Sequence, residues 1–239
     1  MTLDDATTKG LLPAACIFDC DGTLLDSMGA WLDVQPRLLA SFGVEGLTAE
    51  DFAEFESLSV EDECDAYHER WGAGSSGREL CDRLLSMLED AYAREVPPMP
   101  GLVGFARGLH AAGVPMAVAT STPEHLVRAG LAHAGIEGLF DNVTTTGMVS
   151  RSKDFPDVYD YALRRLAEGR GVPEPAHGDV WVFEDAVFGL KSAGASGYKR
   201  VGIFDPAGRF TADEVRANCE IFIEGYDEGL LDRIRAFER

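Results

Sequence analysis

Short apolar or β-branched runs alternate with longer amphipathic segments along most of this chain. The runs span residues 14–18, 115–120, 142–146, 179–183, 200–204 and 221–223. Between most of them lie segments with the apolar spacing and the start or stop signals of helices, over residues 101–113, 121–135, 154–169 and 185–197. Strands that alternate with helices of about 10–15 residues predict βαβ units and a parallel sheet.

Residues 27–97 break this alternation. The sequence there favours helices over 27–43, 48–58, 59–72 and 76–96, and no strand-like run lies among them. We therefore predict an α/β fold with a Rossmann-like parallel-sheet core and an inserted all-helical cap domain. The core would comprise residues 1–26 and 98–239, and the cap residues 27–97. The cap leaves the sheet at the edge where such folds bind ligands, so we expect it to cover the site as a lid.

The chain is strongly acidic, with a formal net charge of −20 over 239 residues. Nucleic acids and anionic membranes require a basic surface, so we expect neither as a partner. No run of about 18 apolar residues is present, and we expect no membrane span. A small anionic substrate is compatible with this charge. Screening acts over roughly 8 Å, so one lysine and one metal ion in a pocket outweigh distant carboxylates.

The cysteines and the N-terminus indicate a cytoplasmic protein. The first 15 residues are acidic and lack the apolar core of a signal peptide. The five cysteines are odd in number, and no two of them form a CxxC pair. This pattern argues against a disulfide framework or a zinc site and favours reduced thiols. We expect the protein to be a monomer or a weak homodimer.

Polar side chains stand at four places near the ends of the predicted strands. They are Asp19 and Asp21, Thr120 and Ser121, Lys153, and Glu184 and Asp185. Each group alone has an ordinary structural explanation. An Asp-Gly pair favours a turn, and Ser121, Thr122 or Asp185 would serve to cap the helix that follows. An isolated lysine is common on a protein surface.

Their joint position on one sheet edge calls for another explanation. Carboxylates from two strand ends that share an edge repel each other unless a divalent cation lies between them. Mg²⁺ prefers an octahedron of oxygen ligands, with a few carboxylates and a substrate phosphate among them. Lys153 and the Thr120 hydroxyl would then bind the remaining phosphate oxygens. The sequence therefore outlines a phosphoryl-transfer site.

Four segments in this order resemble the motifs of the haloacid dehalogenase (HAD) superfamily, in the subfamily with a helical cap that includes phosphoglycolate phosphatases and β-phosphoglucomutases. They are FDCDGTLLDS, Thr120, KDFPD and FEDAVFGLKSAGASG, and the match covers nearly the whole chain. The resemblance implies a Mg²⁺-dependent phosphatase. Its substrate would be a small phosphorylated metabolite, cleaved through an aspartyl-phosphate intermediate.

The resemblance also implies a role for each site residue. Asp19 would be the nucleophile, and Asp21 the general acid and then the general base. The Mg²⁺ ligands would be Asp19, the backbone carbonyl of Asp21, Asp185 and, directly or through water, Glu184. The substrate-binding residues would be Thr120, Ser121 and Lys153.

Three departures from the family pattern keep alternatives open. β-Phosphoglucomutases carry a histidine where this chain has Trp31, so a phosphosugar mutase is the less favoured alternative. Trp31 would be a packing residue at the cap hinge or a wall of the substrate site. Asp154 replaces the first proline of the third motif, and an Asp154–Lys153 ion pair would loosen the lysine. Residues 27–97 contain no lysine, which excludes the Schiff-base chemistry of phosphonatases.

Substrate choice should depend on the cap. The candidate segments are 56–62 and 70–79, with Arg70 or Arg78 able to face a substrate anion, although surface ion pairs explain such arginines more often. The negative charge of the cap favours a neutral leaving group such as a sugar or polyol. A member of this fold that binds a phosphorylated ligand without turnover is a further alternative. The complete set of acidic residues, hydroxyl and lysine argues against it.

Overall fold

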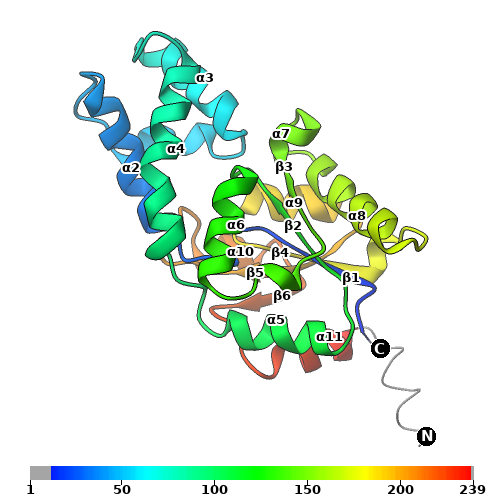
Figure 1. Ribbon diagram of the computed structural model, residues 1–239. Helices are drawn as coiled ribbons and strands as arrows, with labels where there is room; N and C mark the ends of the chain where they lie inside the picture. Colours follow the sequence, from blue (N-terminus) through cyan, green and yellow to red (C-terminus); the bar gives the residue numbers. More distant parts are fainter. Residues whose placement is uncertain (1–11, 238–239) are drawn as a thin grey trace, which may run out of the picture.

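The computed structural model describes residues 12–237, and its centre is one six-stranded parallel sheet (Figure 1). The strands are β1 (Ala15–Phe18), β2 (Met116–Thr120), β3 (Asn142–Thr145), β4 (Val180–Glu184), β5 (Lys199–Ile203) and β6 (Ile221–Ile223). Their order is β3-β2-β1-β4-β5-β6, and every adjacent pair is parallel. Each strand lies within one residue of a predicted run, and the predicted α/β class is confirmed.

Helices cover both faces of the sheet. Alternate side chains of a strand point to opposite faces, and β1 is buried on both. Phe18 packs into the cluster that contains residues of α5 (Leu102–Ala111), α6 (Glu124–His133) and α11 (Leu230–Phe237). Ile17 packs into a separate cluster with α8 (Asp157–Arg170), and α9 (Val187–Ala195) contacts β4 and β5.

The remaining elements of the core are short and lie in connections. They are α7 (Thr146–Val149), α10 (Ala212–Arg216) and the 3₁₀ turns η2 (Glu137–Leu139) and η3 (His177–Asp179). Over residues 12–237, no helix combines the length and the apolar character needed to cross a membrane.

Residues 27–97, all of which the structure describes, contain helices and no strand. The helices are α2 (Met28–Ser41), the 3₁₀ helix η1 (Ala49–Phe55), α3 (Val60–Trp71) and α4 (Gly77–Arg94). Local signals set their ends: Ser59 and Ser76 cap α3 and α4, and Gly72 ends α3 at a positive φ of 64°. Segment 48–58 forms a 3₁₀ helix over most of its length. In Figure 1, α2, α3 and α4 stand together to one side of the sheet.

The two connections between this helical segment and the sheet run side by side. The amide of Asp26 donates to the carbonyl of Pro97 (3.0 Å), and the amide of Met99 donates to that of Leu24 (2.9 Å). Helix α4 packs closely on α6, since a β-carbon on Gly130 would lie 3.2 Å from the Tyr92 ring. One apolar cluster continues from α6 into the helical segment. The division into two domains at 26/27 and 97/98 stays a prediction.

Candidate active site

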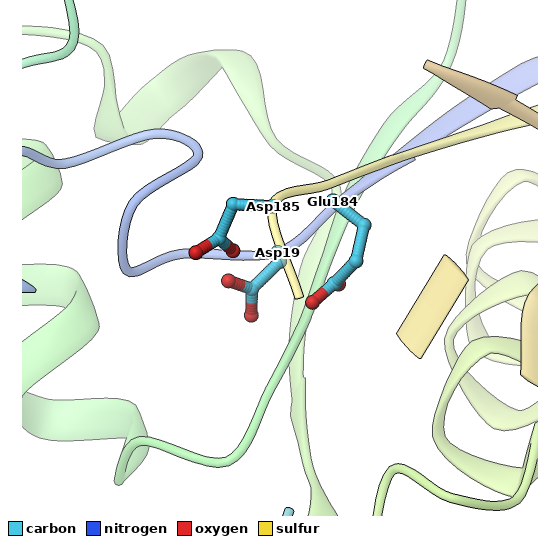
Figure 2. A group of neighbouring side chains, drawn as sticks. All are labelled: Asp19, Glu184 and Asp185. Atoms are coloured by element: carbon cyan, nitrogen blue, oxygen red, sulfur yellow. The ribbon is translucent and has the colours of Figure 1, made fainter. Parts of the chain in front are cut away.

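Three carboxylates converge at the carboxyl ends of two neighbouring strands. Asp19 directly follows β1, Glu184 ends β4, and Asp185 comes next. One oxygen from each lies within 4.8 Å of the others, and all three residues are buried. Figure 2 shows their carboxyl groups gathered at this point. The strand order reverses between β1 and β4, which is where ligands bind in open parallel sheets.

Lys153 supplies the positive charge beside these carboxylates. Its Nζ donates to Asp19 Oδ1 (2.5 Å) and to Glu184 Oε2 (2.9 Å), and the lysine is 3% exposed. Its backbone is fixed on both sides. The amide donates to the carbonyl of Ser57 (2.9 Å), and the carbonyl accepts from the Ser192 hydroxyl (2.7 Å). These bonds hold the ammonium group against Asp19.

Asp154, the residue that departs from the family motif, bonds to hydroxyl groups rather than to the ammonium group of Lys153. Its carboxylate accepts from the hydroxyls of Ser57 (2.7 Å) and Ser152 (2.9 Å). Among the described residues, the ion-pair partners of Lys153 are Asp19 and Glu184, so the expected Asp154–Lys153 pair is wrong. The hydrogen bond of Asp154 with Ser57 instead connects the loop that carries Lys153 to the segment between η1 and α3.

The charges in this cluster do not balance. Burial, followed by the charge of Glu184, raises the pKa of Asp19 to about 8. Burial likewise raises the pKa of Asp185, with further contributions from Asp19 and Glu184. Burial alone would lower the pKa of Lys153, but the charges of Asp19 and Glu184 outweigh it and raise that pKa. Three buried carboxylates with one ammonium group therefore favour uptake of a proton or a cation.

The donor set suits a hard divalent cation. All of its members are carboxylate oxygens, which Mg²⁺ and Ca²⁺ prefer, and it contains no thiol or imidazole. The turn after Asp21 also approaches the cluster closely. Gly22 has a φ of +71°, and a β-carbon there would lie 2.5 Å from Asp185 Oδ2 and 3.2 Å from Asp205 Oδ2. Only glycine leaves this space open, so the described residues fit a small cation.

Asp21 lies in the same pocket, but its side chain is bound by other groups. Oδ1 accepts from the hydroxyls of Ser27 (2.5 Å) and Tyr92 and, at 3.4 Å, from Trp31 Nε1. Oδ2 accepts from the Thr122 hydroxyl (2.6 Å). Trp31 Nε1 also donates to the Tyr92 hydroxyl (2.7 Å), and the indole lines the pocket. Trp31 thus both packs in the cap and orients Asp21.

The loop after β2 contributes hydroxyl groups. The Thr120 hydroxyl accepts from the amide of Thr122 (3.1 Å). The N-cap of α6 is Pro123, so the interpretation of Ser121 or Thr122 as a helix cap is wrong. The Ser121 hydroxyl is buried and has no hydrogen-bond partner among the described residues. A buried hydroxyl left without a partner costs about 1–3 kcal/mol, which a ligand in this pocket would recover.

The structure changes the list of residues that face a substrate. Arg70 and Arg78 are exposed and pair with Glu54 and Asp82. Among the residues that the structure describes, the pocket is lined by residues of segment 56–62 and by none of segment 70–79. The sequence analysis also missed several of its lining side chains, among them Gln35, Glu63, Phe188 and Arg209. Arg209 lies six residues beyond the end of β5, so the strand-end rule that found Asp19 would not have found it.

Comparison with known proteins identifies the family. Residues 16–203 match the haloacid dehalogenase-like hydrolases. The chain belongs to this family. The HAD resemblance seen in the four motifs is therefore confirmed.

Relatives of this haloacid dehalogenase-like hydrolase include phosphatases. The chain is 30% identical over 200 residues to the fructose-1-phosphate phosphatase YqaB of Escherichia coli, covering 80% of this chain and 96% of that protein. CbbY from Rhodobacter sphaeroides, solved with phosphate, has the same fold, with a TM-score of 0.76, 20% identity and coverage of 91% and 96%. β-Phosphoglucomutase from Clostridium difficile follows, with a TM-score of 0.75, 15% identity and coverage of 95% and 98%.

Proposed function

We propose that this haloacid dehalogenase-like hydrolase is a Mg²⁺-dependent phosphatase of a small phosphorylated metabolite, a sugar or polyol phosphate, that acts through an aspartyl-phosphate on Asp19. The carrying observation is the buried contact of Lys153 with Asp19 beside the acidic cluster, in one pocket with Asp21. The fructose-1-phosphate phosphatase relative supports a sugar phosphate as substrate.

The binding residues follow from the donor set. Asp19, Asp185 and the backbone carbonyl of Asp21 would hold Mg²⁺, with Glu184 assisting. When bound, the ion supplies positive charge that offsets the repulsion between a carboxylate and a phosphate dianion. Lys153 would bind the transferring phosphoryl oxygens. The hydroxyls of Thr120 and Ser121 complete the binding of these oxygens, which accounts for the unpartnered Ser121 hydroxyl.

Two steps then balance the reaction. In the first, a carboxylate oxygen of Asp19 bonds to phosphorus while the bond from phosphorus to the leaving oxygen breaks, and Asp21 gives its proton to that oxygen. In the second, water attacks the phosphorus of the aspartyl-phosphate. Asp21 takes a proton from the water, and Asp19 leaves as a carboxylate. The products are the free alcohol and inorganic phosphate.

The cap contributes to the orientation of Asp21. Three of its hydrogen-bond donors belong to the cap segment: Ser27 at its start, Trp31 in α2 and Tyr92 in α4. Opening of the cap would remove the donors on α2 and α4 and admit water and substrate. Closure restores them, so the acid–base group is fully oriented only when the pocket is covered.

Trp31 also makes the mutase the less favoured alternative. The Trp31 indole donates a hydrogen bond but cannot take up and release a proton as a histidine does. A mutase at this site would have to control proton transfer in another way. The following assay therefore includes the mutase reaction.

The test is phosphate release with Mg²⁺ from hexose phosphates, polyol phosphates, phosphoglycolate and nucleotides, with glucose 6-phosphate formation from β-glucose 1-phosphate followed in parallel. Wild type should release phosphate, and Asp19→Ala should release none. Asp33→Ala is the matched control, because Asp33 is an exposed aspartate of α2 that pairs with Arg37. Activity retained in Asp19→Ala would place the nucleophile elsewhere. Glucose 6-phosphate without phosphate release would establish the mutase.

A further inference from the structure

The cap side of the pocket carries four polar residues with no part in the phosphoryl chemistry. They are Gln35 of α2, Glu56 after η1, Glu63 of α3 and Arg209 after β5. We call this set the leaving-group end. Three of its members come from the cap, and Arg209 alone comes from the core. Because they share one pocket with Asp19, they would face the part of a substrate that departs after phosphate transfer.

Hydrogen bonds hold the leaving-group end in a fixed arrangement. Gln35 Nε2 donates to Glu63 Oε1 (2.8 Å) and to the Tyr67 hydroxyl (3.1 Å), and that hydroxyl donates to Glu63. Arg209 Nε lies 3.3 Å from Glu56 Oε2, and its guanidinium reaches Gln35 Oε1 at 3.5 Å. Gln35 and Glu63 are each 6% exposed. A polar network that is satisfied in this way is rigid, so it presents polar groups in fixed positions to whatever occupies the pocket.

The charge of this end is neutral or negative. The positive charge of Arg209 is offset by the negative charge of Glu56. Glu63 adds one negative charge when it is ionised and none when it is protonated. In the described lining of the pocket the only other cation is Lys153, which is paired with Asp19 and Glu184. A second phosphate on a substrate would therefore meet carboxylates and an arginine that is already paired.

We infer that the leaving-group end binds an uncharged, polyhydroxylated leaving group and rejects one that carries a second phosphate, an inference that rests on the proposed phosphatase function. Sugar hydroxyls both donate and accept hydrogen bonds. They match the carboxylates of Glu56 and Glu63 as donors and the guanidinium of Arg209 as acceptors. A phosphate dianion only accepts hydrogen bonds, and carboxylates beside it would weaken its binding by like-charge repulsion. Glu56 and Arg209 thus set the specificity.

The test compares kcat/KM for fructose 1-phosphate with kcat/KM for fructose 1,6-bisphosphate, under the same Mg²⁺ concentration. Wild type should prefer the monophosphate by at least about 100-fold. Glu56→Gln removes the charge that offsets Arg209, and the preference should fall at least about tenfold. Glu54→Gln is the matched control. It makes the same substitution on an exposed glutamate paired with Arg70, and the preference should not change.

Two results would overturn this inference and leave the proposed phosphatase function standing. One is wild-type activity on the bisphosphate within about threefold of that on the monophosphate. The other is an unchanged preference in Glu56→Gln. If that variant does not fold, Arg209→Gln tests the Glu56–Arg209 pair by removing its positive partner. The preference for the monophosphate should then widen. An unchanged preference would count against a role of this pair in specificity. Failure of wild type to hydrolyse any monophosphate, p-nitrophenyl phosphate included, would overturn the proposed function as well.

Discussion

Binding of Mg²⁺ to the acidic cluster should release a proton. Without a cation, burial and the charge of Glu184 raise the pKa of Asp19 to about 8, so near neutral pH the cluster holds a proton. A cation binds the ionised carboxylate, so the proton must leave as the ion enters. Affinity for Mg²⁺ should therefore rise with pH and level off above about 8, the pKa of Asp19.

The size of the effect follows from that pKa. For one displaced proton, the apparent dissociation constant exceeds its limiting value by about 100-fold at pH 6 and about twofold at pH 8. Mg²⁺ should thus bind about fifty-fold more weakly at pH 6 than at pH 8. At pH 7, about 0.9 proton should be released for each ion bound. The raised pKa of Asp185 would add to this number.

Isothermal titration calorimetry from pH 6 to pH 8.5 measures both quantities. Two buffers of different ionisation enthalpy at each pH give the number of protons released. Glu184→Gln removes the second-largest cause of the Asp19 shift, so the pH dependence should move to lower pH in this variant. A dissociation constant that stays the same from pH 6 to pH 8, with no proton release, would refute the reasoning. It would mean that the carboxylates are already ionised without the cation.

Three substitutions give further tests. Asp21→Asn should lower kcat by about 10²–10⁴-fold in steady-state assays, and a smaller loss would deny Asp21 the acid–base role. Gly22→Ala would place a carbon 2.5 Å from the Asp185 carboxylate at a φ of +71°, so calorimetry should show Mg²⁺ affinity lowered at least about tenfold in a folded protein. Ser57→Ala removes the hydrogen bond to Asp154, which positions the loop of Lys153, and should lower kcat/KM about two- to fivefold. Unchanged kinetics would show that this hydrogen bond does not contribute to catalysis.

The sequence predicts the sheet and the acidic cluster well because both depend on local patterns. The buried strands are short apolar runs, and the carboxyl ends of parallel strands share one edge. Asp19 and Asp185, far apart in the chain, could therefore be placed together from strand ends alone. Lys153 was found through its motif, and its contacts with Asp19 and Glu184 could not have been read from spacing.

The cap side of the pocket could not be predicted in the same way. Gln35 and Glu63 lie on helices, where the rotation and packing of the helix decide which side chains face the pocket. Their positions in the chain resemble those of ordinary buried or surface residues. The arginines suggested by the sequence, Arg70 and Arg78, turned out to lie on the surface. The capping interpretation of Ser121 and Thr122 is wrong because Pro123 occupies the N-cap position of α6.

The most direct test of the central claim is mass spectrometry of acid-quenched protein during turnover, with p-nitrophenyl phosphate and Mg²⁺. The p-nitrophenolate leaves without a proton from Asp21, whereas water attack on the intermediate needs Asp21 as base, so Asp21→Asn is the variant to quench. The account predicts a phosphoryl group on the peptide that contains Asp19, and none in the double variant that also carries Asp19→Ala. Turnover of substrate with no phosphorylated peptide, or with the group on another residue, would contradict it.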